Sequence, residues 1–490
     1  MRHKILANFF LVLAITMLGL VVMGYHPGLE DDGVYLSAVR ADLNPALFPH
    51  DADFFRLQLQ ATVFDSAMAH FVRWTGISVA WSEFIWQFAA LFLILGACRG
   101  IAEALFAERS AQWAAVAMVA GLFMLPVAGT ALTIADPHLH PRNLATAFIL
   151  LAAARILKGK RGQAIPLLGI ALLFHPIMAA LGISFCFFLT LALLERSPFG
   201  RQGQRHSLVA VAPLAWVFDS PNPSWRKALD AKNYMHLYQW AWYEWLGALA
   251  PLALFYLLWR TARKHGERRL SRFCLGVLAY GVVQQVLAMA LLAPEALIRM
   301  MPWQPMRYLQ LVYVFLALLA GGLLGRFLLK ARVLRWIAFL LVLNGGMFAA
   351  QWFTVDEGAH LEMPFMASAN PWLQAFDWIR KNTPESAYFA LPPRYMNAPG
   401  EGFRSFRALA ERSQLADGDK DTAMVTQVPS LAPAWDRQQQ ALAGFRSFQL
   451  VDFERLKREF GVDWALVAYP WPGGLTCPWH NGQLAVCRIP

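Results

Sequence analysis

Long apolar runs separated by short polar connections dominate roughly the first 350 residues of the chain. A helix that crosses a membrane needs about 20 mostly apolar residues, because it must span roughly 30 Å of hydrocarbon. By that guide the pattern predicts about eleven transmembrane spans, several of them short. They fall at residues 5–24, 81–98, 114–135, 144–157, 164–174, 177–194, 207–218, 245–259, 273–293, 308–325 and 336–350.

The composition agrees with this pattern. Apolar residues make up 57% of the 490 residues and charged residues only 15%, whereas soluble globular chains have about 25% charged residues. The 35 Phe and 19 Trp also exclude a disordered or low-complexity chain. We therefore expect a polytopic membrane protein.

The net charge of +11 is compatible with nucleic-acid binding, but the distribution of Lys and Arg indicates membrane topology instead. Roughly half of the 43 basic residues lie in alternate connections that start with the N-terminus, and the opposite connections hold far fewer. Short connections rich in Lys and Arg stay in the cytoplasm. This predicts a cytoplasmic N-terminus and, with an odd number of spans, an exterior C-terminal tail. No basic face with interleaved aromatic residues is present, so nucleic acid is not an expected partner.

The chain divides into a membrane module, residues 1–354, with a long first exterior connection at 25–80, and an exterior domain at 355–490. In the second part charges return, and Asn370-Pro371 predicts a helix start. Asp452 predicts the cap of a second helix that ends at Gly461. Strands are expected at residues 386–391, 464–468 and 483–488. The fold class is thus mainly α: a transmembrane helical bundle with a small α/β exterior domain.

Two cysteines, Cys477 and Cys487, fall in this exterior domain, where oxidation is chemically available. They either form a disulfide that closes a short hairpin or remain two free thiols. Cys98, Cys186 and Cys274 lie in apolar runs and are expected to be packing residues.

The strongest candidate for chemistry is the acidic triplet Glu30, Asp31 and Asp32, a few residues beyond the first span. Adjacent carboxylates near a bilayer repel one another, which raises the pKa of some of them and suits a general base or a metal site. The alternative is a solvated acidic cap on the outer end of a helix.

A second candidate is the segment 136–142, Asp-Pro-His-Leu-His-Pro-Arg, in the exterior connection between the third and fourth spans. Its Asp136, His138, His140 and Arg142 can share a phosphate or a metal ion. The alternative is a polar loop stiffened by its prolines.

Two more residues stand at the ends of apolar runs. His175 separates two short runs and either faces a wet cavity or caps the next helix. Arg307 opens the tenth span and either binds a lipid phosphate or extends to the headgroup region. In the exterior domain, the mixed-charge stretch 404–421 is either a solvated loop or a lid over the membrane face.

This layout resembles the GT-C superfamily of membrane glycosyltransferases, and most closely its bacterial members that use a polyprenyl-phosphate sugar. Those proteins share a cytoplasmic N-terminus, roughly eight to thirteen spans, a long first exterior loop with an acidic motif, and often an exterior C-terminal domain. Glu30, Asp31 and Asp32 are similar to that motif in position and composition, and Asp136 stands where a second acidic site often lies. The Trp-Trp-Asp run of oligosaccharyltransferase subunits is missing.

The resemblance implies an inverting transfer of a sugar to an acceptor hydroxyl, with Asp32 or Asp31 as the general base and Glu30 beside them. Cations then stabilise the departing polyprenyl phosphate, and the expected ones are Arg142, His138, His140, Arg307 and His175. Asp136 orients the imidazoles or holds a divalent metal such as Mg or Mn, which the superfamily does not always require. The expected setting is the outer face of a bacterial inner membrane, with a lipid, polysaccharide or protein acceptor in the periplasm.

Three other functions are alternatives to sugar transfer, and each would favour a different feature. A transporter or flippase of a lipid-linked glycan would favour charges in mid-membrane, yet the spans hold few, Glu83 being the main exception. A glycan polymerase or ligase would favour a long exterior loop late in the chain, whereas here the long loop comes first. An assembly or sensory protein would tolerate loss of the carboxylates.

Overall fold

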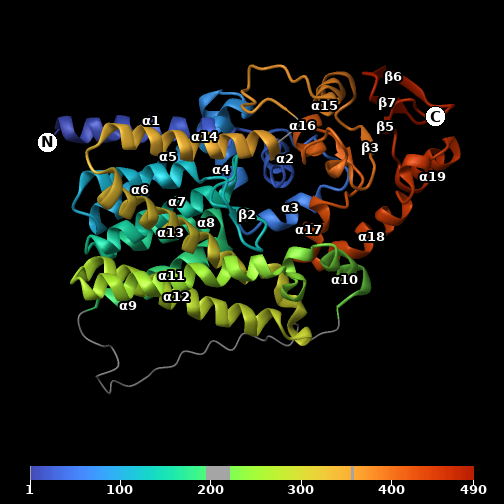
Figure 1. Ribbon diagram of the computed structural model, residues 1–490. Helices are drawn as coiled ribbons and strands as arrows, with labels where there is room; N and C mark the ends of the chain where they lie inside the picture. The colour runs from blue at the N-terminus through green and yellow to red at the C-terminus, as the bar shows by residue number, and fades with distance from the viewer. Residues whose placement is uncertain (1, 195–220, 355–357) are drawn as a thin grey trace.

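The computed structural model describes residues 2–194, 221–354 and 358–490. Most of the described chain is helical, and the long helices run side by side as a bundle with a separate, partly β-structured domain at one end (Figure 1). The bundle helices are α1 (Arg2–Met23), α5 (Val79–Leu105), α6 (Arg109–Gly121), α7 (Pro141–Leu157), α8 (Ala164–Phe174), α9 (Pro176–Leu193), α11 (Trp242–Lys264), α12 (Arg268–Leu292), α13 (Leu309–Leu324) and α14 (Val333–Thr354).

Seven segments of the described chain are long and apolar enough to cross a membrane. They are Ile5–Met23, Val79–Leu105, Pro176–Leu193, Trp242–Lys264, Arg268–Leu292, Pro305–Leu329 and Val333–Thr354. The polytopic class is therefore supported by the helices, whereas the count of eleven spans is wrong.

The sequence pattern predicted too many spans because an apolar run can also be a segment buried by protein inside a bundle. The run 114–135 leaves the helix after Gly121 and continues as a two-stranded hairpin, β1 (Pro126–Val127) and β2 (Leu132–Thr133). The runs 144–157 and 164–174 form helices of 17 and 11 residues, α7 and α8, and almost all of α7 is buried by its neighbours. The run 207–218 lies outside the described residues.

The first long connection folds into short helices. They are α2 (Asp32–Leu43), α3 (Asp53–Leu59) and α4 (Phe64–Thr75). Later connections contribute α10 (Pro223–Asp230) and the 3₁₀ turns η4 (Asn233–Met235), η5 (Leu237–Gln239), η6 (Glu295–Trp303) and η7 (Pro305–Tyr308). A π-helical turn, η8 (Gly325–Leu329), joins α13 to α14.

The C-terminal domain holds a five-stranded sheet of order β4-β3-β5-β7-β6. Its strands are β3 (Tyr388–Ala390), β4 (Ser413–Gln414), β5 (Trp464–Ala468), β6 (Thr476–His480) and β7 (Leu484–Arg488). The pairs β3–β4 and β3–β5 are parallel, and β5–β7 and β7–β6 are antiparallel. The helices are α15 (Pro371–Asn382), α16 (Phe406–Ala410), α17 (Lys420–Gln427), α18 (Ala432–Ala441) and α19 (Leu450–Phe460).

Alternate residues of the sheet enter two separate apolar cores, as the period of two in a strand requires. Phe389 packs with α15 and α16 on one face, while Ala390 packs with α19 on the other. The Asn370 side chain caps α15, as predicted. Gly461 ends α19 in the left-handed conformation, also as predicted, but the cap is Gln449, and Asp452 accepts its backbone N–H from the third helical position.

The C-terminal domain holds the first connection in place. The backbone of Glu30 donates to the Phe403 carbonyl at 2.8 Å, and that of Ser405 donates to the Gly28 carbonyl, also at 2.8 Å. Arg40 of α2 forms an ion pair with Glu411. These contacts fix the segment that carries the acidic triplet.

Candidate functional site

A cavity of about 600 Å³ lies where the bundle meets the C-terminal domain. Its wall brings together segments that are far apart in sequence: the turn before α2, the β1–β2 turn, the start of α7, the α8–α9 break, η4 and η5, η7, and the start of α17. Five basic side chains line it: Arg142, Lys232, Arg307, Arg394 and Lys420.

The acidic triplet divides between two environments. Glu30 and Asp31 line the cavity, while Asp32 turns away from it. Glu30 has a left-handed φ of 47°, so the chain turns sharply just before α2 begins at Asp32. Asp32 is only 2% exposed, accepts the Gly28 N–H at 2.7 Å and faces Glu83 of α5. Burial is the main cause of its raised pKa.

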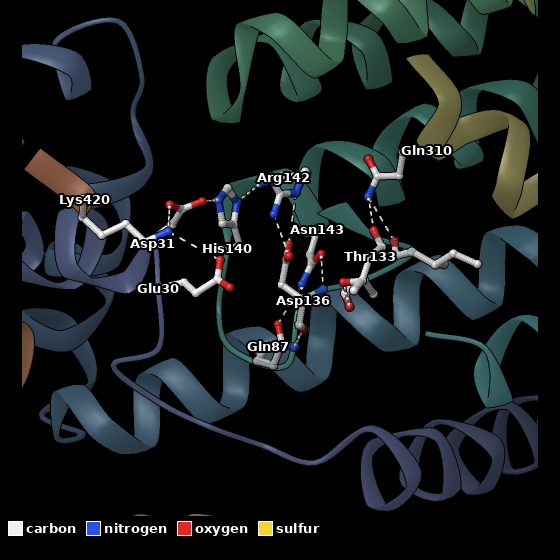
Figure 2. A network of polar contacts seen from close by, with 12 residues as sticks. Glu30, Asp31, Gln87, Thr133, Asp136, His140, Arg142, Asn143, Gln310 and Lys420 are labelled. Atoms are coloured by element: carbon white, nitrogen blue, oxygen red, sulfur yellow. Dashed lines mark hydrogen bonds and ion pairs between the residues drawn. The ribbon is translucent and has the colours of Figure 1, made fainter. Parts of the chain in front are cut away.

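Asp31 is held by a cation and an imidazole (Figure 2). Lys420 Nζ lies 2.9 Å from one carboxylate oxygen and also 3.4 Å from Glu30, and His140 Nε2 lies 3.2 Å from the other oxygen of Asp31. Burial acts to raise the pKa of Asp31, but Lys420 and His140 outweigh it and hold the pKa well below its usual range. Asp31 is thus an ionised carboxylate at the cavity wall, with a side chain 27% exposed.

The hydrogen bonds of His140 assign its tautomer. Its Nδ1 accepts the backbone N–H of Arg142 at 2.9 Å, because His140 is the N-cap of α7. Burial first, and then the charge of Arg142, lower the pKa of His140 to about 4. The ring is therefore neutral near pH 7, its Nε2 carries the proton, and that N–H donates to Asp31. His140 positions the carboxylate rather than supplying charge.

Arg142 and Asp136 form a buried two-point ion pair beside this site (Figure 2). The Arg142 Nη2 and Nε atoms lie 2.6 and 3.1 Å from the two carboxylate oxygens of Asp136. Gln87 and Asn143 donate to the Asp136 backbone carbonyl at 2.6 and 3.3 Å. Burial acts to raise the pKa of Asp136, and Arg142 more than reverses this, so that the pKa falls to about 2.

Among the described residues, two guanidinium groups at the cavity each have a nitrogen atom that is free to donate a hydrogen bond. Arg142 Nη1 and Arg307 Nε have no hydrogen-bond partner within the described part of the chain. His175 also lines the cavity, and its Nδ1 accepts the Met178 N–H at 3.3 Å as the cap of α9. The two alternatives predicted for His175 are therefore both present, because this residue caps a helix and also lines a cavity. His138 is 2% exposed and lies outside the cavity wall.

The residues that the pattern did not single out come chiefly from the C-terminal domain. Lys420 belongs to the mixed-charge stretch 404–421, which is not a solvated loop: Arg407 and Asp421 form a buried ion pair at 2.6 Å. Near Lys420, Asn397 donates to Asp419 at 2.5 Å, and burial followed by the charge of Asp417 raises the pKa of Asp419 to about 6. The clue available in the sequence was the density of charge in this stretch.

The donor set does not suit a divalent metal at Asp136. Arg142 occupies both oxygens of that carboxylate. Across residues 2–194, 221–354 and 358–490, no group of three or more His, Cys, Asp or Glu side chains is placed to hold a metal ion. A Mg or Mn site needs several oxygen ligands around one point, and we derive no metal-dependent step.

Away from the cavity, Cys477 of β6 and Cys487 of β7 are joined in a disulfide. The bond links the edge strand of the C-terminal sheet to its neighbour. Cys98, Cys186 and Cys274 are buried and free.

Comparison with known proteins gives a match that lies in the C-terminal domain. Residues 370–426 match a family model described as a domain of unknown function (DUF6798). A search of curated proteins found no match to the chain. The matched segment runs from the cap of α15 into α17 and includes Lys420, so it covers the part of the C-terminal domain that reaches Asp31.

Proposed function

We propose that this protein is a membrane glycosyltransferase of the GT-C type, which moves a sugar from a polyprenyl-phosphate donor to an acceptor hydroxyl with inversion. The observation that carries the proposal is one cavity whose wall holds an ionised carboxylate, Asp31, and two guanidinium groups with unused donors, Arg142 and Arg307. A general base near a phosphate-binding set is what such a transfer requires.

The proposed chemistry uses these groups in a single displacement. Asp31 accepts the proton of the acceptor hydroxyl while that oxygen attacks the anomeric carbon. The bond between this carbon and the phosphate oxygen breaks, and its electron pair leaves with the polyprenyl phosphate. Arg142 and Arg307 stabilise the charge that develops on the phosphate, since guanidinium groups match its oxygens in geometry. Asp31 takes the role of base in place of Asp32 because Asp32 is buried outside the cavity wall.

The seven apolar segments of membrane length in the described part of the chain support a lipid-linked donor, whose prenyl chain remains among the helices while its sugar phosphate enters the cavity. In this proposal the N-terminus is cytoplasmic and the cavity opens on the outer face of a bacterial inner membrane. The acceptor approaches from the side of the C-terminal domain, whose Asn397, Asp419 and Lys420 line the cavity.

Arg307→Ala is expected to raise the KM for the donor roughly 10- to 100-fold, because a hydrogen bond between a charged group and a phosphate is worth about 1.5–3 kcal/mol. The measurement is the initial rate of transfer against donor concentration, with the thermal unfolding midpoint as a control for folding. Arg307→Lys, which keeps the charge, should lose less. A donor KM equal to that of the wild type in Arg307→Ala would remove this residue from the phosphate site.

Lys420→Met is expected to bring an acidic limb into the pH profile of transfer. With Lys420 removed, the largest influence that lowers the pKa of Asp31 is lost, and burial then raises this pKa. Asp31 then gains its proton as the pH falls through this higher value, and transfer stops there, whereas the wild type stays active. The matched control is Lys227→Met, whose half-exposed amine pairs with Asp436 away from the cavity. An unchanged profile would separate Lys420 from the base.

The decisive assay supplies purified protein with radiolabelled polyprenyl-phosphate sugars and measures free polyprenyl phosphate together with glycosylated acceptor. Bond cleavage that depends on Asp31 supports a transferase. Movement of intact donor across proteoliposomes without cleavage would support a transporter or flippase instead. Use of polyprenyl diphosphate carrying a whole glycan would support a polymerase or ligase.

A further inference from the structure

A second cavity, of about 700 Å³, lies at the end of the bundle opposite the candidate site. It is formed by the first turns of α1, the start of α6, the connection after η8 and the start of α14. These segments meet at the N-terminal end of the bundle, far from the C-terminal domain (Figure 1). Residues of α1 and of α14 both line the cavity.

The charges at this cavity favour an anion. Arg109, Arg326 and Lys330 line it, and Glu108, the one acid among the described residues of its wall, is already bound to Arg326 at 3.1 Å. Arg326 also binds Glu267 at 2.6 Å. Arg109 and Lys330, by contrast, take part in no ion pair with any residue that the structure describes, and both side chains are exposed.

The backbone places Lys330 at this position. The chain passes through the π-helical turn η8 and reaches Lys330 with a left-handed φ of 49°, an uncommon conformation for a residue with a side chain. Trp336 Nε1 donates to the Lys330 carbonyl at 3.0 Å and holds the turn against α14. A costly local conformation thus sets an unpaired cation beside the cavity.

Most of the remaining wall is apolar or aromatic, with Asn8 and Ser110 as polar members. Leu11 of α1, Trp113 of α6 and Trp336 of α14 belong to it. Tryptophan is enriched where the hydrocarbon of a membrane meets its headgroups. The helix α14 buries few of its own residues, and Ile337 and Leu341 on it are about half and two-thirds exposed. An acyl chain can therefore lie along the exposed apolar face of α14.

We propose that this cavity binds an anionic phospholipid, with its phosphate on Arg109 and Lys330 and its acyl chains along Leu11 and α14. Charge complementarity selects an anionic headgroup over a zwitterionic one, and the exposed apolar side chains of α14 beside the cavity select a lipid over a soluble phosphate. The site is independent of the proposed transferase function, because it lies at the other end of the helices and shares no residue with the first cavity.

The test is native mass spectrometry of the full-length protein in detergent, titrated with phosphatidylglycerol or with phosphatidylcholine of the same acyl chains. The wild type should retain phosphatidylglycerol in preference. Arg109→Gln with Lys330→Gln should weaken its binding about 30-fold, since each basic residue near a membrane surface contributes about 1 kcal/mol. Both side chains are exposed, so the unfolding midpoint should not change.

Two further variants separate binding at this cavity from a general effect of surface charge. Lys160→Gln with Arg161→Gln removes two exposed charges from a connection outside the cavity and should leave binding unchanged. Leu11→Trp keeps the charges but fills the apolar wall, and should weaken binding as well. Equal retention of the two lipids, wild-type affinity in the Arg109 and Lys330 double variant, or displacement of the lipid by free glycerol phosphate would each overturn the proposal.

Discussion

Asp31→Asn is expected to reduce sugar transfer about 100- to 10,000-fold, the range that a general base contributes to a proton transfer. Asparagine keeps the size of the side chain and can still accept a hydrogen bond from His140, but it cannot take a proton from the acceptor. The loss should appear in kcat, because the proposed role of Asp31 belongs to the chemical step and the donor phosphate is bound by other residues. The measurement is the rate of polyprenyl phosphate release at saturating donor.

The matched control is Asp53→Asn, which removes an exposed carboxylate from the same first connection, away from the cavity. It should transfer sugar at the rate of the wild type. Asp32→Asn is the more informative comparison, since Asp32 is buried against Glu83 and its loss acts on the packing of α2. Sugar transfer by Asp31→Asn at the wild-type rate, with normal expression and an unchanged unfolding midpoint, would contradict the assignment of Asp31 as the general base.

The sequence could identify the triplet but could not choose among its members. The three carboxylates are consecutive in the sequence, and which of them faces the cavity depends on the backbone turn at Glu30 and on the start of α2 at Asp32. Lys420 was harder still, because it lies 389 residues from Asp31 along the chain. A pattern of local charges says nothing about which distant segment will neutralise them.

Local signals predicted local structure well. An Asn-Pro pair placed the start of α15, and a glycine placed the end of α19, because both rest on the backbone geometry of helix termini. The strand at Trp464–Ala468 was also found at its predicted position. The number of spans failed for the opposite reason: burial within a bundle and burial in lipid both select apolar residues, so a run such as 144–157 does not reveal which one applies.

The segment 136–142 shows how the same residues can serve structure and chemistry together. Asp136 holds the guanidinium of Arg142 in a fixed plane, and the N-cap geometry of His140 turns its Nε2 toward Asp31. The prolines Pro137 and Pro141 limit the backbone on either side of the imidazoles. The segment is therefore the physical link between the proposed phosphate site and the proposed base.

Breaking the buried pair from one side should be strongly destabilising. Asp136→Ala leaves the Arg142 charge buried without its partner, and we expect a loss of about 3–5 kcal/mol in the free energy of unfolding. The measurement is denaturant or thermal unfolding in detergent. The double variant Asp136→Ala with Arg142→Met removes both charges and should recover part of this loss, since most of the cost lies in the uncompensated charge.

An exposed pair in the C-terminal domain supplies the control for this cycle. Arg380 and Asp377 lie 2.6 Å apart but are each about two-fifths exposed, so Asp377→Ala should cost no more than about 1 kcal/mol. If Asp136→Ala proved as mild as this control, Arg142 would have access to water, and its guanidinium would not be held in advance for a phosphate. Because Arg142 also lines the cavity, recovery of stability in the double variant without recovery of transfer would separate its contribution to folding from its contribution to donor binding.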